Sequence, residues 1–132
     1  MQLVAAYFST AVIFLIIDAV VLKTVLRPLF ERNLADQLLD DLRIVPAALF
    51  YLFYVAGVVH FVSAPALAQG APLKALAGGV LLGAMAYGTY EFTNYATLRS
   101  WHWHMVAVDL AWGAALTGFS AWAGVMIART IG

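Results

Sequence analysis

The chain has 132 residues, of which 64% are hydrophobic and 11% are charged, and its seven basic and seven acidic residues give no net charge. Soluble domains average about 45–50% apolar and about 25% charged residues, so this composition excludes an ordinary water-soluble globular protein. The neutral balance gives no indication of a nucleic-acid partner. The absence of cysteine excludes disulfides, thiol nucleophiles and cysteine-ligated metals. We therefore predict a small membrane protein with a single domain over residues 1–132.

Four apolar stretches are long enough to cross a bilayer as helices, which takes about 20 residues each. We predict spans at residues 3–25, 44–64, 73–95 and 105–128. The first stretch lacks the basic start and small-residue cleavage site of a secretory signal, so we expect it to be a retained span. The expected fold is an all-α membrane protein, a four-transmembrane-helix antiparallel bundle.

Lys and Arg near the ends of the spans predict the orientation, because these residues concentrate in cytoplasmic loops. Five of them lie in or beside the first and third loops: Lys23, Arg27, Arg32, Arg43 and Arg99. The opposite side holds Lys74 and Arg129. Both termini are therefore expected to face the periplasm or exterior.

The first loop has a pattern of its own. Apolar residues recur in it at four-residue spacing: Phe30, Leu34, Leu38 and Leu42. This spacing predicts a short amphipathic helix over residues 29–42 that lies in the cytoplasmic interface, or whose apolar face covers that end of the bundle. Asp40 or Asp41 is then expected to cap the second span, with Pro46 in its first turn. Residues 65–72 are expected to form a short turn.

Three acidic residues lie inside the predicted spans: Asp18, Glu91 and Asp109. A carboxylate at this depth costs roughly 2.5 kcal/mol or more. At a rise of about 1.5 Å per residue, all three fall in one layer, roughly 7 to 10 Å to the cytoplasmic side of the helix centres. Intramembrane ionisable residues mark functional sites by default, so this layer is the candidate site. A structural role, in which each acid bonds a Tyr, Trp, Asn or Arg to fix helix register, fits the pattern equally well.

Small residues at four-residue spacing follow the third and fourth spans. The two stripes are Gly79, Gly83, Tyr87 and Glu91 on one helix and Asp109, Gly113, Thr117 and Ala121 on the other. Such stripes let membrane helices approach closely, so we expect them to face each other and to bring Glu91 and Asp109 together. The candidate ligand-binding cluster is therefore Asp18, Glu91 and Asp109, with Tyr87, Asn94 and Trp112 as neighbours.

Other possible sites are weaker. His102 and His104 have the spacing of a chelating pair, but they lie where aromatic and histidine side chains gather at the headgroup level, so no metal site is predicted. His60 is expected toward the opposite end, which argues against a haem held by two histidines. No hydrolase, nucleotide-binding or metalloprotease motif is present, and the sequence identifies no cofactor.

Several motifs together resemble an uncharacterised family of small four-helix bacterial inner-membrane proteins, a domain-of-unknown-function group. The motifs are Asp18, Pro46-Ala47, Phe50-Tyr51 with Tyr54 and Gly57, Pro65-Ala66-Leu67, GAMAYGTYEFTN at 83–94 and VDLAWG at 108–113. The resemblance covers nearly the whole chain. It implies a four-helix fold and a multi-pass location in the bacterial inner membrane, but no activity and no catalytic residue. Asp is common in the family where this chain has Glu91, which has a longer side chain.

Three functions remain open at this point. The first is an accessory or binding subunit of a membrane assembly, or a binder of a lipid or other small apolar ligand; its partners would be the lipid bilayer, a membrane protein or a second copy of the chain. The second is an enzyme that modifies a lipid or isoprenoid, with Asp18, Glu91 and Asp109 as acid/base groups or as ligands of a divalent ion. The third is a proton- or ion-coupled carrier that acts as an oligomer. The few polar groups expected in the exterior half count against it: Ser9, Thr10, His60 and Thr117.

Overall fold

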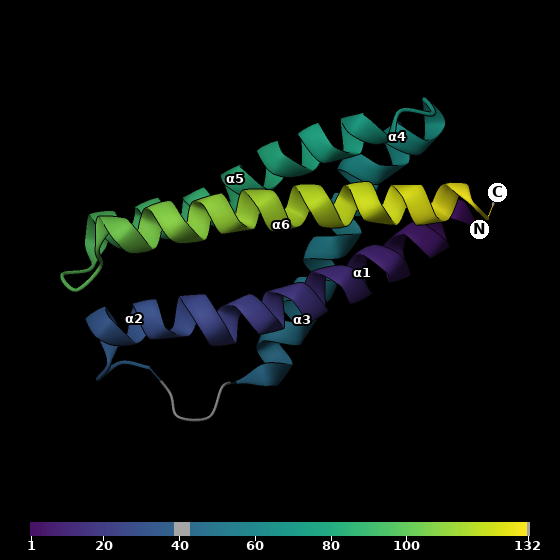
Figure 1. Ribbon diagram of the computed structural model, residues 1–132. Coiled ribbons are helices and arrows are strands. Elements are labelled where there is room, and N and C mark those ends of the chain that lie inside the picture. Colours follow the sequence, from purple (N-terminus) through teal and green to yellow (C-terminus); the bar gives the residue numbers. More distant parts are fainter. Residues whose placement is uncertain (39–42, 132) are drawn as a thin grey trace.

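The computed structural model describes residues 1–38 and 43–131, and every regular element within them is helical, as the sequence predicts (Figure 1). The α-helices are α1 (Gln2–Val21), α2 (Arg27–Leu34), α3 (Ile44–Val58), α4 (Ala64–Ala68), α5 (Pro72–Thr97) and α6 (Trp103–Arg129). Two short π-helical segments, η1 (Leu22–Leu26) and η2 (Val59–Ser63), connect α1 to α2 and α3 to α4.

The first helix runs without a break from Gln2 to Leu34, a length of 33 residues. The prediction of a separate helix over 29–42 is therefore wrong in its first part, because residues 29–34 continue the first helix. Pro28 does not stop it, although proline lacks an N–H and its ring crowds the carbonyl group four residues earlier, at Thr24. Thr24 lies in η1, where the wider π turn makes room for the ring. Residues 39–42, with the predicted caps, lie outside the described residues.

The second helix also contains a proline that a preceding π segment accommodates. It runs from Ile44 to Ala68, and Pro65 lies four residues after Phe61, which belongs to η2. The predicted turn at 65–72 is therefore wrong in its first half, since the helix continues to Ala68. The remaining turn contains Gly70 at φ 60°, in the left-handed region that glycine adopts at no steric cost.

Within residues 1–38 and 43–131, three helical segments have the length and hydropathy of a membrane span: Gln2–Leu34, Ile44–Ala68 and Trp103–Arg129. Helix α5 is not among them, although its 26 residues are enough to cross a bilayer. Its glycines, threonines and Asn94, together with Lys74 and Glu91, make it less apolar than the others.

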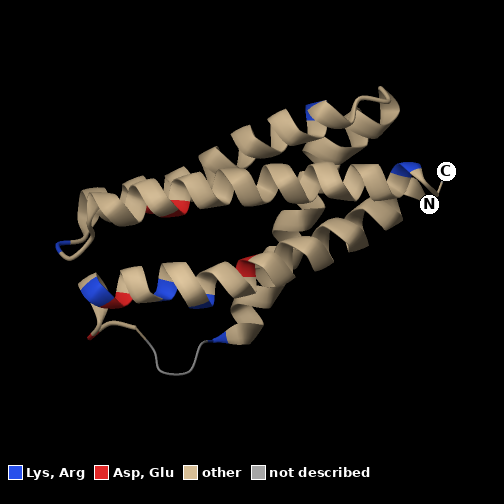
Figure 2. Ribbon diagram, in the orientation of Figure 1, with Lys and Arg blue, Asp and Glu red and all other residues tan. Residues whose placement is uncertain are grey.

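The helices pack mainly around α6. Helices α5 and α6 lie side by side and form the most extensive contact, and α1 packs against the other side of α6, while α3 crosses α1 (Figure 1). The two termini lie together at one end of the molecule, here called the termini end. The opposite end, called the α2 end, holds α2 and the loop between α5 and α6. Lys and Arg residues lie along η1 and α2 and otherwise near helix ends (Figure 2).

The contact between α5 and α6 depends on glycine. A Cβ atom added at Gly83 would lie 2.4 Å from the carbonyl oxygen of Gly113 and 2.8 Å from Cβ of Thr117. One added at Gly79 would lie 2.7 Å from Cα of Gly118. The ring of Tyr87 covers Gly113, where an added Cβ would lie 2.0 Å from Cγ of the tyrosine. The expectation that the two small-residue stripes face each other is confirmed.

The α2 end has its own apolar cluster. Leu34 packs there with Trp101, Met105 and Val106, and the less buried Leu29, Phe30 and Leu38 join them. The apolar stripe of the first loop thus covers the end of the α5–α6 pair. Of its two expected placements, the one over the bundle is the one that the structure shows for residues 29–38.

Replacement of Gly83 by alanine should destabilise the protein by about 1–3 kcal/mol, because the new methyl group meets backbone that cannot move aside. Gly57→Ala in α3 is the matched control, since no atom lies within 4 Å of its added Cβ. Denaturation of the purified variants in mild detergent, followed by circular dichroism, measures the difference. Equal stability of the two variants would mean that α5 and α6 are not in close contact.

Candidate functional site

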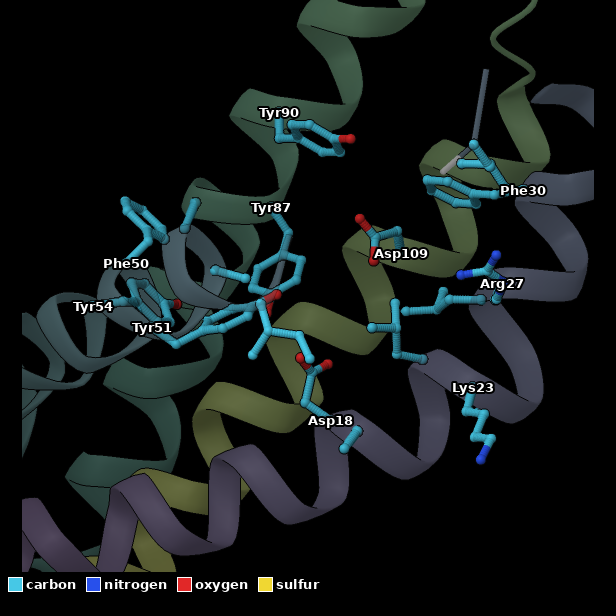
Figure 3. A pocket seen from close by; sticks show the side chains of 17 residues that line it. Asp18, Lys23, Arg27, Phe30, Phe50, Tyr51, Tyr54, Tyr87, Tyr90 and Asp109 are labelled. Atoms are coloured by element: carbon cyan, nitrogen blue, oxygen red, sulfur yellow. The ribbon is translucent and has the colours of Figure 1, made fainter. Parts of the chain in front are cut away.

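A pocket of about 1050 Å³ lies at the α2 end, and all four long helical segments contribute to its walls. Most of the wall is apolar. Six aromatic residues contribute to it: Phe30, Phe50, Tyr51, Tyr54, Tyr87 and Tyr90. Two acids, Asp18 and Asp109, and two basic residues, Lys23 and Arg27, also line it (Figure 3). The pocket is therefore an aromatic chamber with charged groups at a few places.

The pocket gathers part of the predicted cluster. Asp18, Tyr87 and Asp109 line it, whereas Glu91 and Trp112 lie behind the wall and interact with lining residues. Asn94 does not line the pocket, and its side chain interacts with that of Tyr90, one turn earlier on α5.

A tryptophan on another helix holds Asp18. The indole Nε1 of Trp112, on α6, donates a hydrogen bond of 3.1 Å to Oδ1 of Asp18, on α1. Asp18 is 5% exposed, and the hydroxyl of Tyr51 on α3 interacts with it as well. Figure 3 shows the rings of Tyr51 and Tyr87 next to this carboxylate. Side chains of four helical segments therefore meet around Asp18.

The second acid pair lies closer to the α5–α6 loop. Glu91 is completely buried, and its Oε1 accepts a 2.9 Å hydrogen bond from Nε1 of Trp101. Its Oε2 has no donor among the described residues, and the Asp109 carboxyl lies within hydrogen-bonding reach of Glu91. Two ionised carboxylates only accept hydrogen bonds and repel each other, so a bond between these groups requires a proton on one of them.

The hydroxyl of Tyr54 anchors the floor of the pocket. It lies 2.9 Å from Oγ1 of Thr117, which connects α3 to α6 on the side toward the termini end. This bond holds α3 against the bundle below the pocket. Above it, the first turns of α3 are exposed, including Ile44, Val45 and Phe50. The chamber is thus closed at its base and open along α3.

The carboxylates have no basic partner within the described part of the chain. The one ion pair found there joins Nε of Arg27 to Oε1 of Glu31 at 2.9 Å, one turn apart on α2. The groups that bond the buried acids are neutral: the indoles of Trp101 and Trp112, and the hydroxyl of Tyr51 beside Asp18. No group of three or more His, Asp or Glu residues in the described ranges is placed to hold a metal ion. The rings of His102 and His104 stack on each other at 5.6 Å.

Sequence reasoning did not assign two of these groups to the site. Trp101 directly precedes His102 and His104, which the sequence predicts at the headgroup level, yet it is 7% exposed and bonds Glu91 across the end of α5. Helical periodicity stops at the loop, so no pattern could predict this contact. Tyr51 was noted for the family resemblance but not for the site, although its position three residues before Tyr54 places both on one face of α3.

Trp101→Phe should cost about 1–3 kcal/mol of stability, because the ring still fills its place while buried Glu91 loses its donor. The same change in a Glu91→Gln background should cost less, since the amide donates to Asp109 and leaves no buried charge. A double-mutant cycle by chemical denaturation measures this coupling. Trp103→Phe, at a side chain that is 58% exposed, is the matched control. Equal costs in both backgrounds would contradict the bond between Trp101 and Glu91.

No curated protein and no solved structure matches the chain. A family model described as "Predicted membrane protein (DUF2177)" matches residues 3–126, a range that includes every residue of the site described above. The family resemblance of the sequence is thereby confirmed: the chain belongs to the DUF2177 family of predicted membrane proteins.

Proposed function

We propose that this protein binds a lipid or another largely apolar small molecule in the pocket at the α2 end, either alone or as the binding subunit of a larger membrane assembly. The observation that carries this proposal is the pocket itself. Its volume of about 1050 Å³ exceeds what a drug-sized ligand needs, and its walls are mostly apolar with few polar groups. Binding sites for small molecules have this composition, because apolar walls provide affinity and a few polar groups fix orientation.

The open side of the pocket supports entry from the bilayer. Helices α3 and α5 both line the pocket, but α3 packs mainly on α1. Phe50 on α3 and Tyr90 on α5 border the pocket and are 61% and 53% exposed. In a membrane these side chains face acyl chains, so an apolar ligand reaches the carboxylates without crossing water.

The proposal includes four spans, with α5 as the third, in an antiparallel bundle in the bacterial inner membrane. The adjacent termini support an even number of crossings (Figure 1). The distribution of five basic residues in or beside the first and third loops, against two on the opposite side, supports a pocket in the cytoplasmic half of the membrane.

Cysteine labelling tests this topology, because the chain contains no cysteine of its own. Ser100→Cys, in the loop after α5, should react with an impermeant maleimide only in inverted vesicles. Gln69→Cys, in the turn before α5, should react in intact spheroplasts. A reversed result would move the pocket to the outer half of the membrane. Labelling of both positions from the same side would show that α5 does not cross.

Ligand retention tests the binding function. The protein purified in lipid nanodiscs should keep a small molecule that native mass spectrometry detects. Ala86→Trp should abolish retention, because Ala86 lines the pocket and the indole fills it. Met85→Trp is the matched control, since Met85 is 61% exposed and does not line the pocket.

The outcomes of this experiment separate the alternatives. Retention by Met85→Trp but not by Ala86→Trp supports binding in the pocket. Equal retention by both variants would remove the pocket from the function. A stoichiometric protein with no small molecule would favour the accessory role and leave the acids as groups that fix helix positions.

Catalysis on a lipid or isoprenoid is a second candidate, favoured by one observation. Asp109 lines the pocket and lies within hydrogen-bonding reach of Glu91, so a pair of carboxyl groups that can pass one proton between them borders the ligand space. Such a pair can act as general acid and base. A retained molecule that changes mass during incubation in the wild type, but not in Asp109→Asn, would support this candidate over simple binding.

A further inference from the structure

From the distribution of charge around the pocket, and resting on the proposed binding function, we infer that the ligand is a hydrophobic organic cation, an ammonium or related group attached to an apolar body. The inference specifies the chemical class of the ligand for the site already described. Four observations support it: the charge balance of the acids, the aromatic walls, the direction of the basic side chains and a tyrosine hydroxyl whose hydrogen bonding is incomplete.

The acids inside the pocket have no counter-charge from the described chain. Asp18 and Asp109 are 5% and 6% exposed, and neither forms an ion pair with a described Lys or Arg. Trp112 gives Asp18 a neutral N–H, which orients the carboxylate without balancing its charge. An ionised carboxylate away from water is costly unless an opposite charge lies beside it. A cationic ligand would provide that charge when it is bound.

The aromatic walls suit the same ligand. The rings of Tyr54 and Tyr87 lie 6.5 Å apart at 70° to each other, and the ring of Phe50 stacks on Tyr54 at 6.5 Å. Tyr51 and Tyr90 extend this wall toward the two acids (Figure 3). The face of an aromatic ring attracts a cation electrostatically, and the attraction is stronger where water is excluded. Aromatic rings beside carboxylates therefore favour a cation over a neutral or anionic molecule of the same shape.

The basic residues of the pocket lie on the first helix beyond Asp18, toward the α2 end. Lys23 and Arg27 follow Asp18 by roughly 7 and 13 Å along the helix axis, at about 1.5 Å per residue. The amine of Lys23 points away from Asp18 and Asp109 (Figure 3). The guanidinium of Arg27 bonds Glu31 at 2.9 Å. Neither side chain neutralises the inner acids, so the interior of the pocket has an excess of acidic groups.

A hydroxyl beside the acids, that of Tyr87, interacts with the side chain of Tyr51 but forms no full hydrogen bond within the described residues. The Oη atom of Tyr87 is buried and makes no hydrogen bond within the described residues, although the tyrosine lines the pocket. Incomplete hydrogen bonding of a buried hydroxyl is unfavourable, so a ligand that completes it gains affinity. Because this oxygen can accept a hydrogen bond, it adds a polar contact for an ammonium N–H next to Asp18.

Charge selectivity is measured with two probes of the same shape and opposite charge, tetraphenylphosphonium and tetraphenylborate. Wild-type protein in phosphatidylcholine nanodiscs should bind the phosphonium saturably and at least about tenfold more tightly than the borate, a difference of about 1.4 kcal/mol. Empty nanodiscs correct for partition of each probe into lipid. The comparison uses the wild type alone, so it does not depend on whether any variant folds.

Binding to variants then shows which acids attract the phosphonium. Asp18→Asn and Asp109→Asn should each weaken binding of the phosphonium about tenfold or more. Asp36→Asn, at an exposed acid outside the pocket, should not change it. Ala86→Trp should abolish saturable binding of either probe.

Three results would overturn the inference. Equal binding of both probes, blocked by Ala86→Trp, would keep the binding function and remove the charge preference. Tighter binding of the borate, lost in Lys23→Gln, would assign the pocket to an anionic ligand. If neither probe binds saturably, the charge inference is wrong. If native mass spectrometry also detects no retained molecule, the proposed binding function is wrong too.

Discussion

The close approach of α5 to α6 is the constraint on which the site depends. Gly79 and Gly83 let the two backbones meet, and this distance places Glu91 beside Asp109 and seats the ring of Tyr87 over Gly113. In lipid, association of helices comes from packing and hydrogen bonds and not from exclusion of water, so the glycine contact is a main source of cohesion. The chamber lies at the α2 end of the bundle, where the first and second helices complete its walls around this pair.

Two indole groups then join the acids to this frame. Trp112 connects α6 to Asp18 on α1, and Trp101 connects the loop after α5 to Glu91. Trp101 also belongs to the apolar cluster under Leu34, so the same side chain contacts both the covering segment and a buried acid. Displacement of α2 would therefore disturb Glu91 and its neighbour Asp109. The buried acids and the apolar cluster at α2 therefore share one side chain, that of Trp101.

Sequence reasoning located the parts of the site that follow from helical geometry. The stripe that contains Gly83 and the depth of the acids depend only on residue spacing along a helix, so the pairing of Glu91 with Asp109 was predictable. Contacts across a loop, such as that of Trp101, do not follow from spacing. The helix boundaries near Pro28 and Pro65 are predicted wrongly for a different reason. Proline normally marks a helix end, and only the tertiary structure shows that a π turn accommodates each of these two prolines.

The π segment η1 also sets the rotational phase of the first helix. Sixteen residues separate Asp18 from Leu34, and at about 100° per residue a pure α-helix would turn them about 160° apart, onto nearly opposite faces. A π turn holds one more residue than an α turn. The residues after it are therefore rotated back by about 100° around the helix axis. Asp18 and Leu34 are consequently both buried toward α6 and its loop. The length of η1 thus determines which face of α2 is turned toward α6. Insertion or deletion of one residue at 22–26 would rotate α2 and move Leu34 away from its cluster.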